Sequence, residues 1–491
     1  MKKKIAVIGS GFGGLAAANR LAAVGHDVHL FDKRDKLGGR AYQYEIDNFK
    51  FDGGPTVITA PYIFDEIFQL AGKKREDYFE LVPLDPFYRI FDEKGNHFDY
   101  RHQLNDMLTE IDKWHPADKK GYVKFVNQTK KLFEKLHPYT DQPFLSFSRM
   151  LKIMPDVIRF YGWQATYAFV SRYIKHPFLR RVFSFHPLLI GGNPFNTPAL
   201  YTLIVQFEKE WGVHYAKGGT GKIVQALGQL LEDIGGTIHL NSEIKEIVIR
   251  DKKVTGIKWA DDSYEPFDIV VSNGDVSFTY AHLIHKQYRK KWTDNRLNRL
   301  RYSNSLVVIY FGTRRRYLDS GLHHHNIIVN SRYKELLRDV FKRVTLPNDF
   351  SLYLHMPTIT DSTIAPEGHE SFYVLSLVPH MDAGVDWDSI GQEYRERVLM
   401  FLEDNYLPDL RENIVALHHI DPPHFQNTLN SYKGAAFATQ PSLLQSAYFR
   451  PHSKSEEFEN LYFVGAGTHP GAGVPAVLSS GKIAANLIDQ S

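Results

Sequence analysis

Three glycines close to the N-terminus constrain the fold of this chain more than any other feature: Gly9, Gly11 and Gly14, in the run Ile-Gly-Ser-Gly-Phe-Gly-Gly. The apolar residues 5–8 before them predict a buried parallel strand, and residues 15–23 after them predict a helix. Gly9 permits the tight turn, Gly11 lets the backbone approach a pyrophosphate, and Gly14 lets the helix pack closely on the strand. Because the helix N-terminus then faces the phosphates, the motif predicts a dinucleotide-binding turn.

Two further elements indicate which dinucleotide binds. Asp32 ends a second apolar strand, residues 28–31, where its carboxylate can bind the ribose hydroxyls. An acidic residue there favours FAD or NAD over NADP, whose extra phosphate it would repel. A second glycine pair ends at Gly39 and is followed by Arg40. The glycines let the backbone come close to a ligand, and the guanidinium of Arg40 can donate a fork of hydrogen bonds to phosphate or flavin oxygens. This second element favours a flavin.

Composition excludes several other classes of protein. The 491 residues are 43% hydrophobic and carry a net charge of +3, which argues against nucleic acid as the main partner. Cysteine is absent, so disulfides, thiolate catalysis, iron–sulfur clusters and a cysteinyl flavin are excluded. No apolar stretch approaches the length of a membrane span. The length predicts two interleaved domains.

The order of motifs predicts a discontinuous α/β cofactor domain. Residues 1–80, 216–275 and 456–491 carry the glycine-rich turns and the apolar strands 237–240 and 270–272. We therefore expect these three pieces to form a Rossmann-like FAD-binding domain. The inserts, residues 81–215 and 276–455, would form an α+β region that binds substrate and faces a membrane.

The C-terminal piece carries the second strong motif. A strand from Leu461 is followed by Val-Gly-Ala-Gly-Thr-His-Pro-Gly-Ala-Gly-Val-Pro, which ends at Pro475. Small residues around Gly465 allow backbone amides to reach a ligand. The helix that starts near Gly473 and Val474 offers free N–H groups where the negative charge of a reduced flavin would lie.

With these motifs, the chain resembles the FAD-containing amine oxidase and carotenoid desaturase superfamily and, within it, the bacterial-type phytoene desaturases. The resemblance covers nearly the whole length and is carried by residues 51–59, 184–195, 210–213, 351–355, 365–368, 445–451 and 464–475. It implies FAD, phytoene as a membrane-dissolved polyene hydrocarbon, stepwise desaturation to lycopene, and oxygen or a quinone as electron acceptor. By the same resemblance, the FAD contacts are Gly9, Gly11, Gly14, Asp32, Gly39, Arg40, Ile244, Gly465, Gly473 and Val474.

Several functions stay open on these grounds. A C30 desaturase that uses dehydrosqualene, or a later carotenoid desaturase or isomerase, shares nearly all the motifs. A flavin amine oxidase would need a polar amine site, which the sequence does not reveal. Prenyl-protein escort proteins share the fold, but they tend to lose the flavin motifs that this chain keeps.

The sequence does not identify a catalytic residue. Desaturation transfers a hydride to the flavin and releases a proton from the neighbouring carbon, so the proton needs an acceptor. Glu208, Glu210 and His214 lie just before the glycine-rich turn at residue 218, but each is typical of a surface charge or a satisfied polar group. Three consecutive histidines, 323–325, have poor spacing for metal ligands, and we expect a solvated loop and no metal there.

The implied substrate bears on where the protein acts. A C40 hydrocarbon favours lipid over water by roughly 30 kcal/mol, so the enzyme has to dock on a membrane. Segment 144–181 has seven basic residues against one acid, Asp156: Arg149, Lys152, Arg159, Arg172, Lys175, Arg180 and Arg181. Ile153, Val157, Phe160 and Tyr161 alternate with them at helical spacing. Periodicity alone fits a core-packed helix equally well. We expect the membrane-facing alternative, in a cytoplasmic protein bound peripherally to the membrane.

Overall fold

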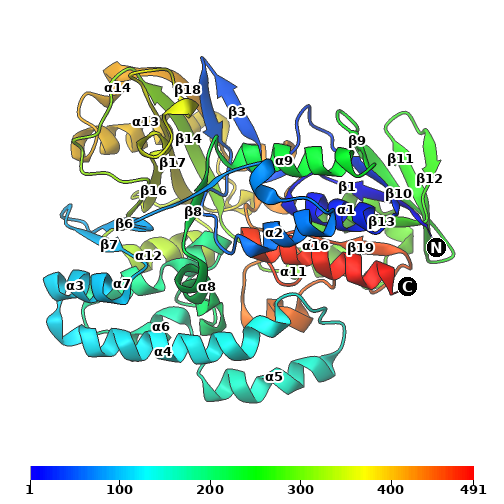
Figure 1. Cartoon of the computed structure of the whole chain (residues 1–491), viewed down its shortest axis with the longest axis horizontal. Coiled ribbons are helices and arrows are strands. Elements are labelled where there is room, and N and C mark those ends of the chain that lie inside the picture. The colour runs from blue at the N-terminus through cyan, green and yellow to red at the C-terminus, as the bar shows by residue number, and fades with distance from the viewer. Residues whose placement is uncertain (1, 491) are drawn as a thin grey trace.

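The computed structural model describes residues 2–490 and contains two large sheets at opposite ends of the molecule (Figure 1). The smaller one is a five-stranded parallel sheet whose strands come from three distant stretches of chain. In sheet order they are β19 (Leu461–Phe463), β13 (Ile269–Ser272), β1 (Lys4–Ile8), β2 (Asp27–Phe31) and β9 (Thr237–His239). Ile5 on the central strand pairs with Val28 on one side and Ile269 on the other.

Helices cover one face of this sheet and a meander covers the other. The helices are α1 (Phe12–Ala23), α2 (Tyr62–Leu70), α9 (Thr220–Asp233) and α16 (Val474–Asp489). The meander is formed by β10 (Ile244–Arg250), β11 (Lys253–Trp259) and β12 (Tyr264–Pro266). Close packing of α1 on α16 depends on small residues, since a Cβ at Gly481 would lie 2.8 Å from the Cβ of Ala16. This arrangement confirms the predicted Rossmann-like α/β fold.

The second sheet has seven strands and separates two cores. Its order is β18 (Ile414–Ile420), β14 (Ser305–Thr313), β17 (Glu370–Val378), β16 (Leu352–His355), β15 (His325–Ile328), β6 (Tyr88–Phe91) and β7 (His97–Tyr100). Side chains alternate along β14: Val307 and Ile309 pack toward α13 (Trp387–Asn405), whereas Val308 and Tyr310 point to the opposite face.

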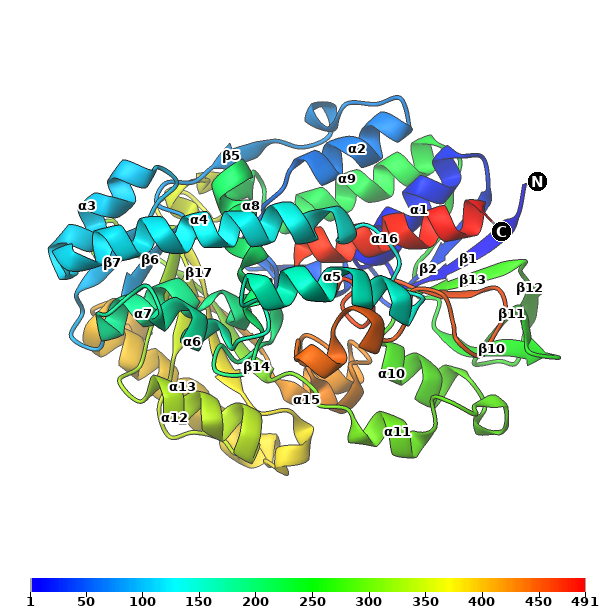
Figure 2. The ribbon, with the colours of Figure 1, turned by 90° about the horizontal axis from the view of Figure 1, so that it is seen from below.

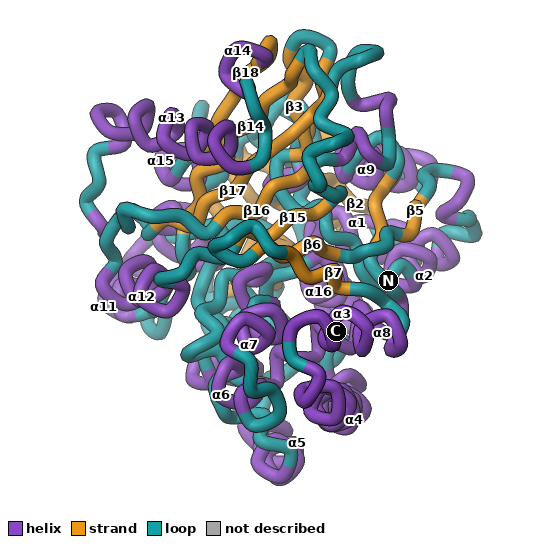
Figure 3. The backbone as a smooth tube through the Cα atoms, turned by 90° about the vertical axis from the view of Figure 1, so that its left-hand side faces the viewer, coloured by secondary structure: helices purple, strands orange, loops and turns teal. Residues whose placement is uncertain are grey.

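A helical layer lies below that opposite face (Figures 2 and 3). It consists of α3 (Leu104–Trp114), α4 (Lys119–Leu136), α5 (Phe147–Arg159), α6 (Thr166–Ser171), α7 (Pro177–Ser184) and α8 (Leu203–Trp211). The remaining elements are short: β3 (Gln43–Ile46), β4 (Phe49–Asp52), β5 (Leu81–Pro83), β8 (His214–Ala216), α10 (Val276–Phe278), α11 (Asp294–Arg299), α12 (Tyr333–Arg338), α14 (Leu410–Asn413) and α15 (Pro422–Asn427). Within residues 2–490, every helix is too short or too polar to cross a membrane.

The predicted elements around the N-terminal motif are present with small shifts. The first helix begins at Phe12, three residues before the predicted start, so the helix takes in part of the glycine motif. Strands were predicted at 28–31, 237–240 and 270–272, and they span Asp27–Phe31, Thr237–His239 and Ile269–Ser272. The domain division at residues 80, 216, 275 and 456 stays a prediction.

Candidate active site

One continuous cavity extends from the N-terminal turn to the face of the seven-stranded sheet that carries Val308 and faces the helical layer. Nine of the ten predicted cofactor residues line it: Gly9, Gly11, Asp32, Gly39, Arg40, Ile244, Gly465, Gly473 and Val474. The exception is Gly14, which is buried inside α1. Three stretches that are far apart in the sequence, 9–40, 244 and 465–474, therefore meet around one space.

The glycine turn has the close contacts that the motif requires. Gly9 adopts φ +95°, where L side chains are strained, and its N–H donates to the carbonyl of Phe31 at 2.7 Å. A Cβ at Gly14 would lie 2.0 Å from the carbonyl oxygen of Gly9, so only glycine lets α1 start this close to β1. A Cβ at Gly11 would lie 2.8 Å from the side-chain nitrogen of Asn273. At Gly9 and Gly11 the turn thus presents only backbone to the cavity.

The carboxylate of Asp32 is held in place by hydrogen bonds from the glycine turn and from the loop that follows β2. Its Oδ2 accepts the backbone N–H of Ser10 at 2.8 Å, and its Oδ1 accepts that of Arg34 at 2.9 Å. Oδ2 also accepts the hydroxyl of Ser10 at 2.5 Å, so of the roughly four acceptor sites of a carboxylate one remains, on Oδ1, for a ribose hydroxyl. The arrangement fits the adenosine half of FAD.

Arg40 and Asp275 form a buried polar pair whose hydrogen bonds are incomplete. Nη2 of Arg40 donates to Ser431 Oγ at 2.7 Å, while Nε of Arg40 and Oδ2 of Asp275 have no partner among residues 2–490. Burial lowers the pKa of Arg40 and raises the pKa of Asp275. Buried polar atoms are rarely left unpaired, so these two indicate a polar group in the cavity beside them. The residues present therefore fit a flavin dinucleotide.

Asn273 is a site residue that the sequence motifs did not reveal. It follows β13 directly, and its Nδ2 donates to the carbonyl of Gly9 at 3.3 Å. Its Oδ1 would lie 2.6 Å from a Cβ at Gly13 and 2.8 Å from a Cβ at Gly465. The amide thus lies between the two glycine-rich loops. Its position at the carboxyl end of a parallel strand was the one available signal.

Beyond the cofactor half, the cavity wall is apolar. The sheet contributes Val308, Leu375 and Ile327, and the helical layer contributes Phe185, Leu188, Ile204 and Phe207. Such a wall binds hydrocarbon through area removed from water, at about 25 cal/mol per Å².

Tyrosines of the sheet anchor the segment that joins the two halves. Tyr310 donates to the carbonyl of Gly53 at 3.0 Å, and Tyr373 donates to that of Gly54 at 3.3 Å. Thr56 Oγ1 lies 2.7 Å from the hydroxyl of Tyr373 and 3.0 Å from that of Tyr353. These bonds fix segment 53–56, which lines the cavity.

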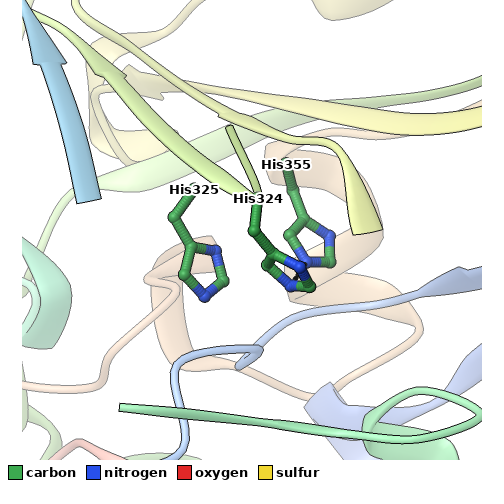
Figure 4. A group of neighbouring side chains, drawn as sticks. All are labelled: His324, His325 and His355. Atoms are coloured by element: carbon green, nitrogen blue, oxygen red, sulfur yellow. Dashed lines mark hydrogen bonds between the residues drawn. The ribbon is translucent and has the colours of Figure 1, made fainter. Parts of the chain in front are cut away.

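The expectation of a solvated loop at residues 323–325 is wrong. His324 and His325 are buried, and strand pairing places His325 opposite His355 (Figure 4). The cause is tertiary: β15 lies between β16 and β6, inside the sheet. Burial lowers the pKa of all three imidazoles well below 6.5, so they are neutral.

These histidines make two separate hydrogen bonds. Nε2 of His324 lies 3.1 Å from Nε2 of His355, and Nδ1 of His325 lies 2.6 Å from the hydroxyl of Tyr353. One ring nitrogen of each of the three histidines lies within 4.8 Å of the others, as metal ligands can. Nε2 of His325 and Nδ1 of His355 are buried without a hydrogen-bond partner among residues 2–490, so the cluster is only partly satisfied by these bonds. The absence of a metal stays a prediction.

The three candidates for a proton acceptor lie in different environments. Glu208 is fully buried and lines the cavity, whereas Glu210, on the same helix, is exposed. His214 is part of β8, and its backbone pairs with Ile58. Only Glu208 is brought to the site.

The basic segment 144–181 differs from its prediction in one respect. Ile153 and Val157 point inward and pack with Met150, so they are core residues. The exposed apolar residues of α5 are instead Phe147, Leu151 and Ile158. The helix therefore has apolar side chains on its inner and its outer faces.

Comparison with known proteins identifies the family. The family model for flavin containing amine oxidoreductases matches residues 12–489. A phytoene desaturase (lycopene-forming) of Pseudescherichia vulneris is 44% identical over 488 residues, 99% of each chain. One of Pantoea ananas is 43% identical over 488 residues, again 99% of each chain.

The chain belongs to the flavin-containing amine oxidoreductases and, within them, to the phytoene desaturases. It is accordingly an FAD-dependent oxidoreductase. The structure superposes on the crystal structure of an oxidoreductase from Methanosarcina mazei over 100% of each chain, with a TM-score of 0.69. The two sequences are 17% identical, so this comparison shows a shared fold. When bound between the glycine-rich loops and Arg40, FAD supplies hydride acceptance.

Proposed function

We propose that the protein is an FAD-dependent phytoene desaturase that inserts double bonds stepwise into phytoene to give lycopene. The supporting observation is the single cavity that joins a dinucleotide cradle to an apolar wall. Its ends match the two parts of the reaction, a flavin and a hydrocarbon. Both named relatives form lycopene, according to their names. Oxygen or a membrane quinone would reoxidise the flavin.

In this proposal, the protein positions the substrate and excludes water. The hydrocarbon is held by van der Waals contact between the sheet, which contributes Val308 and Leu375, and α8, which contributes Phe207. Segment 53–56, fixed by the tyrosine hydroxyls, lines the same cavity and lies where the two halves meet. A dry apolar channel also protects an allylic cation from capture by water.

A product assay tests the substrate. Purified FAD-loaded protein receives phytoene or dehydrosqualene in liposomes, and the pigments are extracted and identified. We expect lycopene from phytoene. Conversion of dehydrosqualene alone would establish the C30 alternative and contradict the proposal.

We further propose that α5 and its neighbours bind the membrane surface, in a cytoplasmic protein held peripherally. Phe147, Leu151 and Ile158 of α5 are 48%, 56% and 57% exposed, and Leu444 is 72% exposed. The ring of Phe147 lies 6.3 Å from that of Phe449, which joins the two segments into one face. We call these residues, with Leu145 and Trp163, the α5 face. Arg149, Lys152 and Arg159 supply positive charge for anionic headgroups.

The segment that leads into α5 reaches the cavity. Thr140 and Pro470 line the cavity, and the ring of Phe144 packs 4.7 Å from that of His469. A hydrocarbon that leaves the bilayer here has a short path to the apolar wall. Figure 2 shows α5 on the outside of the helical layer.

Charge reversal tests this surface. Arg149→Glu, Lys152→Glu and Arg159→Glu together should weaken binding to anionic liposomes at least tenfold, at about 1 kcal/mol for each basic residue near the surface. The matched control reverses three exposed lysines on the meander: Lys245, Lys252 and Lys253. Equal loss in both variants, or in neither, would place the membrane surface elsewhere.

A further inference from the structure

Glu208 is the one acidic residue in the apolar part of the cavity wall. It lies on α8 with its side chain fully buried, between Phe207 and the sheet. The other acids in the lining, Asp32, Glu243 and Asp275, lie on the cofactor side. A carboxylate in this position needs an explanation, because a purely hydrocarbon-binding wall gains nothing from it.

Two polar side chains hold the carboxylate in one orientation. The hydroxyl of Tyr88 donates to Oε1 at 2.7 Å, and Nε2 of His186 lies 3.0 Å from Oε2. Burial, and next the charge of Glu208, raise the pKa of Tyr88 well above its ordinary value, so Tyr88 stays a donor. Burying a carboxylate costs several kcal/mol even when it is paired. The protein thus holds an ordered carboxyl group at a position where an apolar side chain would cost less free energy to bury.

Aromatic and polar side chains follow one another from Glu208 toward the cofactor side, with a ring contact and no hydrogen bond between Tyr88 and His325. The ring of Tyr88 lies 6.0 Å from that of His325, whose Nδ1 bonds the hydroxyl of Tyr353. Tyr353 in turn bonds Thr56, at the end of segment 53–56. Glu208 is therefore close to the polar row that supports this segment, and it faces the space that the hydrocarbon would occupy.

We propose that Glu208 is the proton acceptor of the desaturation. This inference rests on the proposed function. One carbon of the substrate loses a hydride to FAD, which oxidises the substrate by two electrons and leaves an allylic cation. The neighbouring C–H bond then breaks, its electron pair forms the new double bond, and its proton goes to a carboxylate oxygen of Glu208. The anion also stabilises the cation before the proton leaves.

Glu208→Gln tests the assignment with a matched control on the same helix. FAD-loaded protein is mixed anaerobically with phytoene in liposomes, and the rate of flavin reduction is followed. Removing one group that stabilises the charge developing as the hydride leaves costs about 10²- to 10³-fold, so the rate of flavin reduction should fall by at least about 100-fold while FAD content, melting temperature and phytoene binding stay unchanged. Glu210→Gln, at the exposed position, should reduce flavin at the wild-type rate.

Further variants separate a catalytic role from a structural one. Glu208→Ala should regain part of its rate with added sodium formate, which supplies a carboxylate to the emptied space. Glu208→Asp retains the charge and should lose about tenfold or more, and it decides the question if Glu208→Gln does not fold.

The outcomes distinguish this inference from the proposed function. A wild-type protein whose flavin stays oxidised with phytoene contradicts the proposed function itself. A reactive wild type with Glu208→Gln within threefold of it overturns the role of Glu208. Loss of flavin reduction in Asp275→Asn alone, at full FAD content, would place the acceptor on the cofactor side and overturn it as well.

Discussion

Gly14→Ala examines the geometry on which the cofactor site depends. The new Cβ would lie 2.0 Å from the carbonyl oxygen of Gly9, where ordinary contact begins at 3.4 Å, so α1 and the turn must separate by about 1.4 Å. Neither atom belongs to a flexible side chain, and α1 is also wedged against α16 at Gly481. Overpacking of this kind costs about 1–3 kcal/mol, against a gain of about 1 kcal/mol in helix propensity.

The larger effect of Gly14→Ala is on FAD. A shift above 1 Å lengthens hydrogen bonds from the turn amides to the pyrophosphate beyond about 3.5 Å. Losing two bonds to a charged group costs about 3–6 kcal/mol, or roughly 10²- to 10⁴-fold in affinity. We expect protein purified without bound FAD, measured by absorbance at the flavin band. Gly391→Ala on α13 is the control, since its Cβ meets only the mobile end of Arg395, at 3.0 Å. A fully FAD-loaded Gly14→Ala protein with wild-type melting temperature would refute the placement of the dinucleotide.

Two further predictions concern buried groups. Since His324, His325 and His355 have lowered pKa values when folded, the unfolded chain binds more protons below pH 6.5, and stability falls as pH falls. Between about pH 7.5 and about pH 5.5, each of these imidazoles lowers the free energy of unfolding by about 1.4 kcal/mol. In urea titrations, His355→Asn should therefore lose about 1.4 kcal/mol less than the wild type over this pH range. An unchanged pH dependence of stability in His355→Asn would contradict this prediction. Arg40→Met should weaken FAD binding at least about 100-fold by equilibrium titration, because a buried charged donor is lost; wild-type affinity would remove Arg40 from the site.

The cofactor half of the site was predictable because its constraints are local. Gly9 and Gly14 each meet a backbone requirement set within a few residues, and Asp32 follows from where a short strand ends. Nine predicted residues accordingly line one cavity. Asn273 escaped prediction because its role comes from two loops at opposite ends of the chain, which meet only in the folded sheet.

The substrate half was less predictable because strand pairing decides burial there. Three consecutive histidines are typical of a solvated loop until β15 is placed between two other strands. The same holds for α5, whose periodicity could not show that Ile153 faces the core while Leu151 faces outward. Glu208 and Glu210 are two positions apart in sequence, and only the packing of α8 separates a buried carboxylate from a solvated one.

The central claim is that this cavity brings a flavin and a polyene hydrocarbon together for desaturation. Anaerobic mixing of the FAD-loaded protein with phytoene in liposomes tests it most directly, with the flavin spectrum and the extracted pigment followed together. We predict bleaching of the flavin together with a product of longer conjugation, and lycopene after reoxidation and further turnover. A flavin that stays oxidised while phytoene is recovered unchanged would contradict the account.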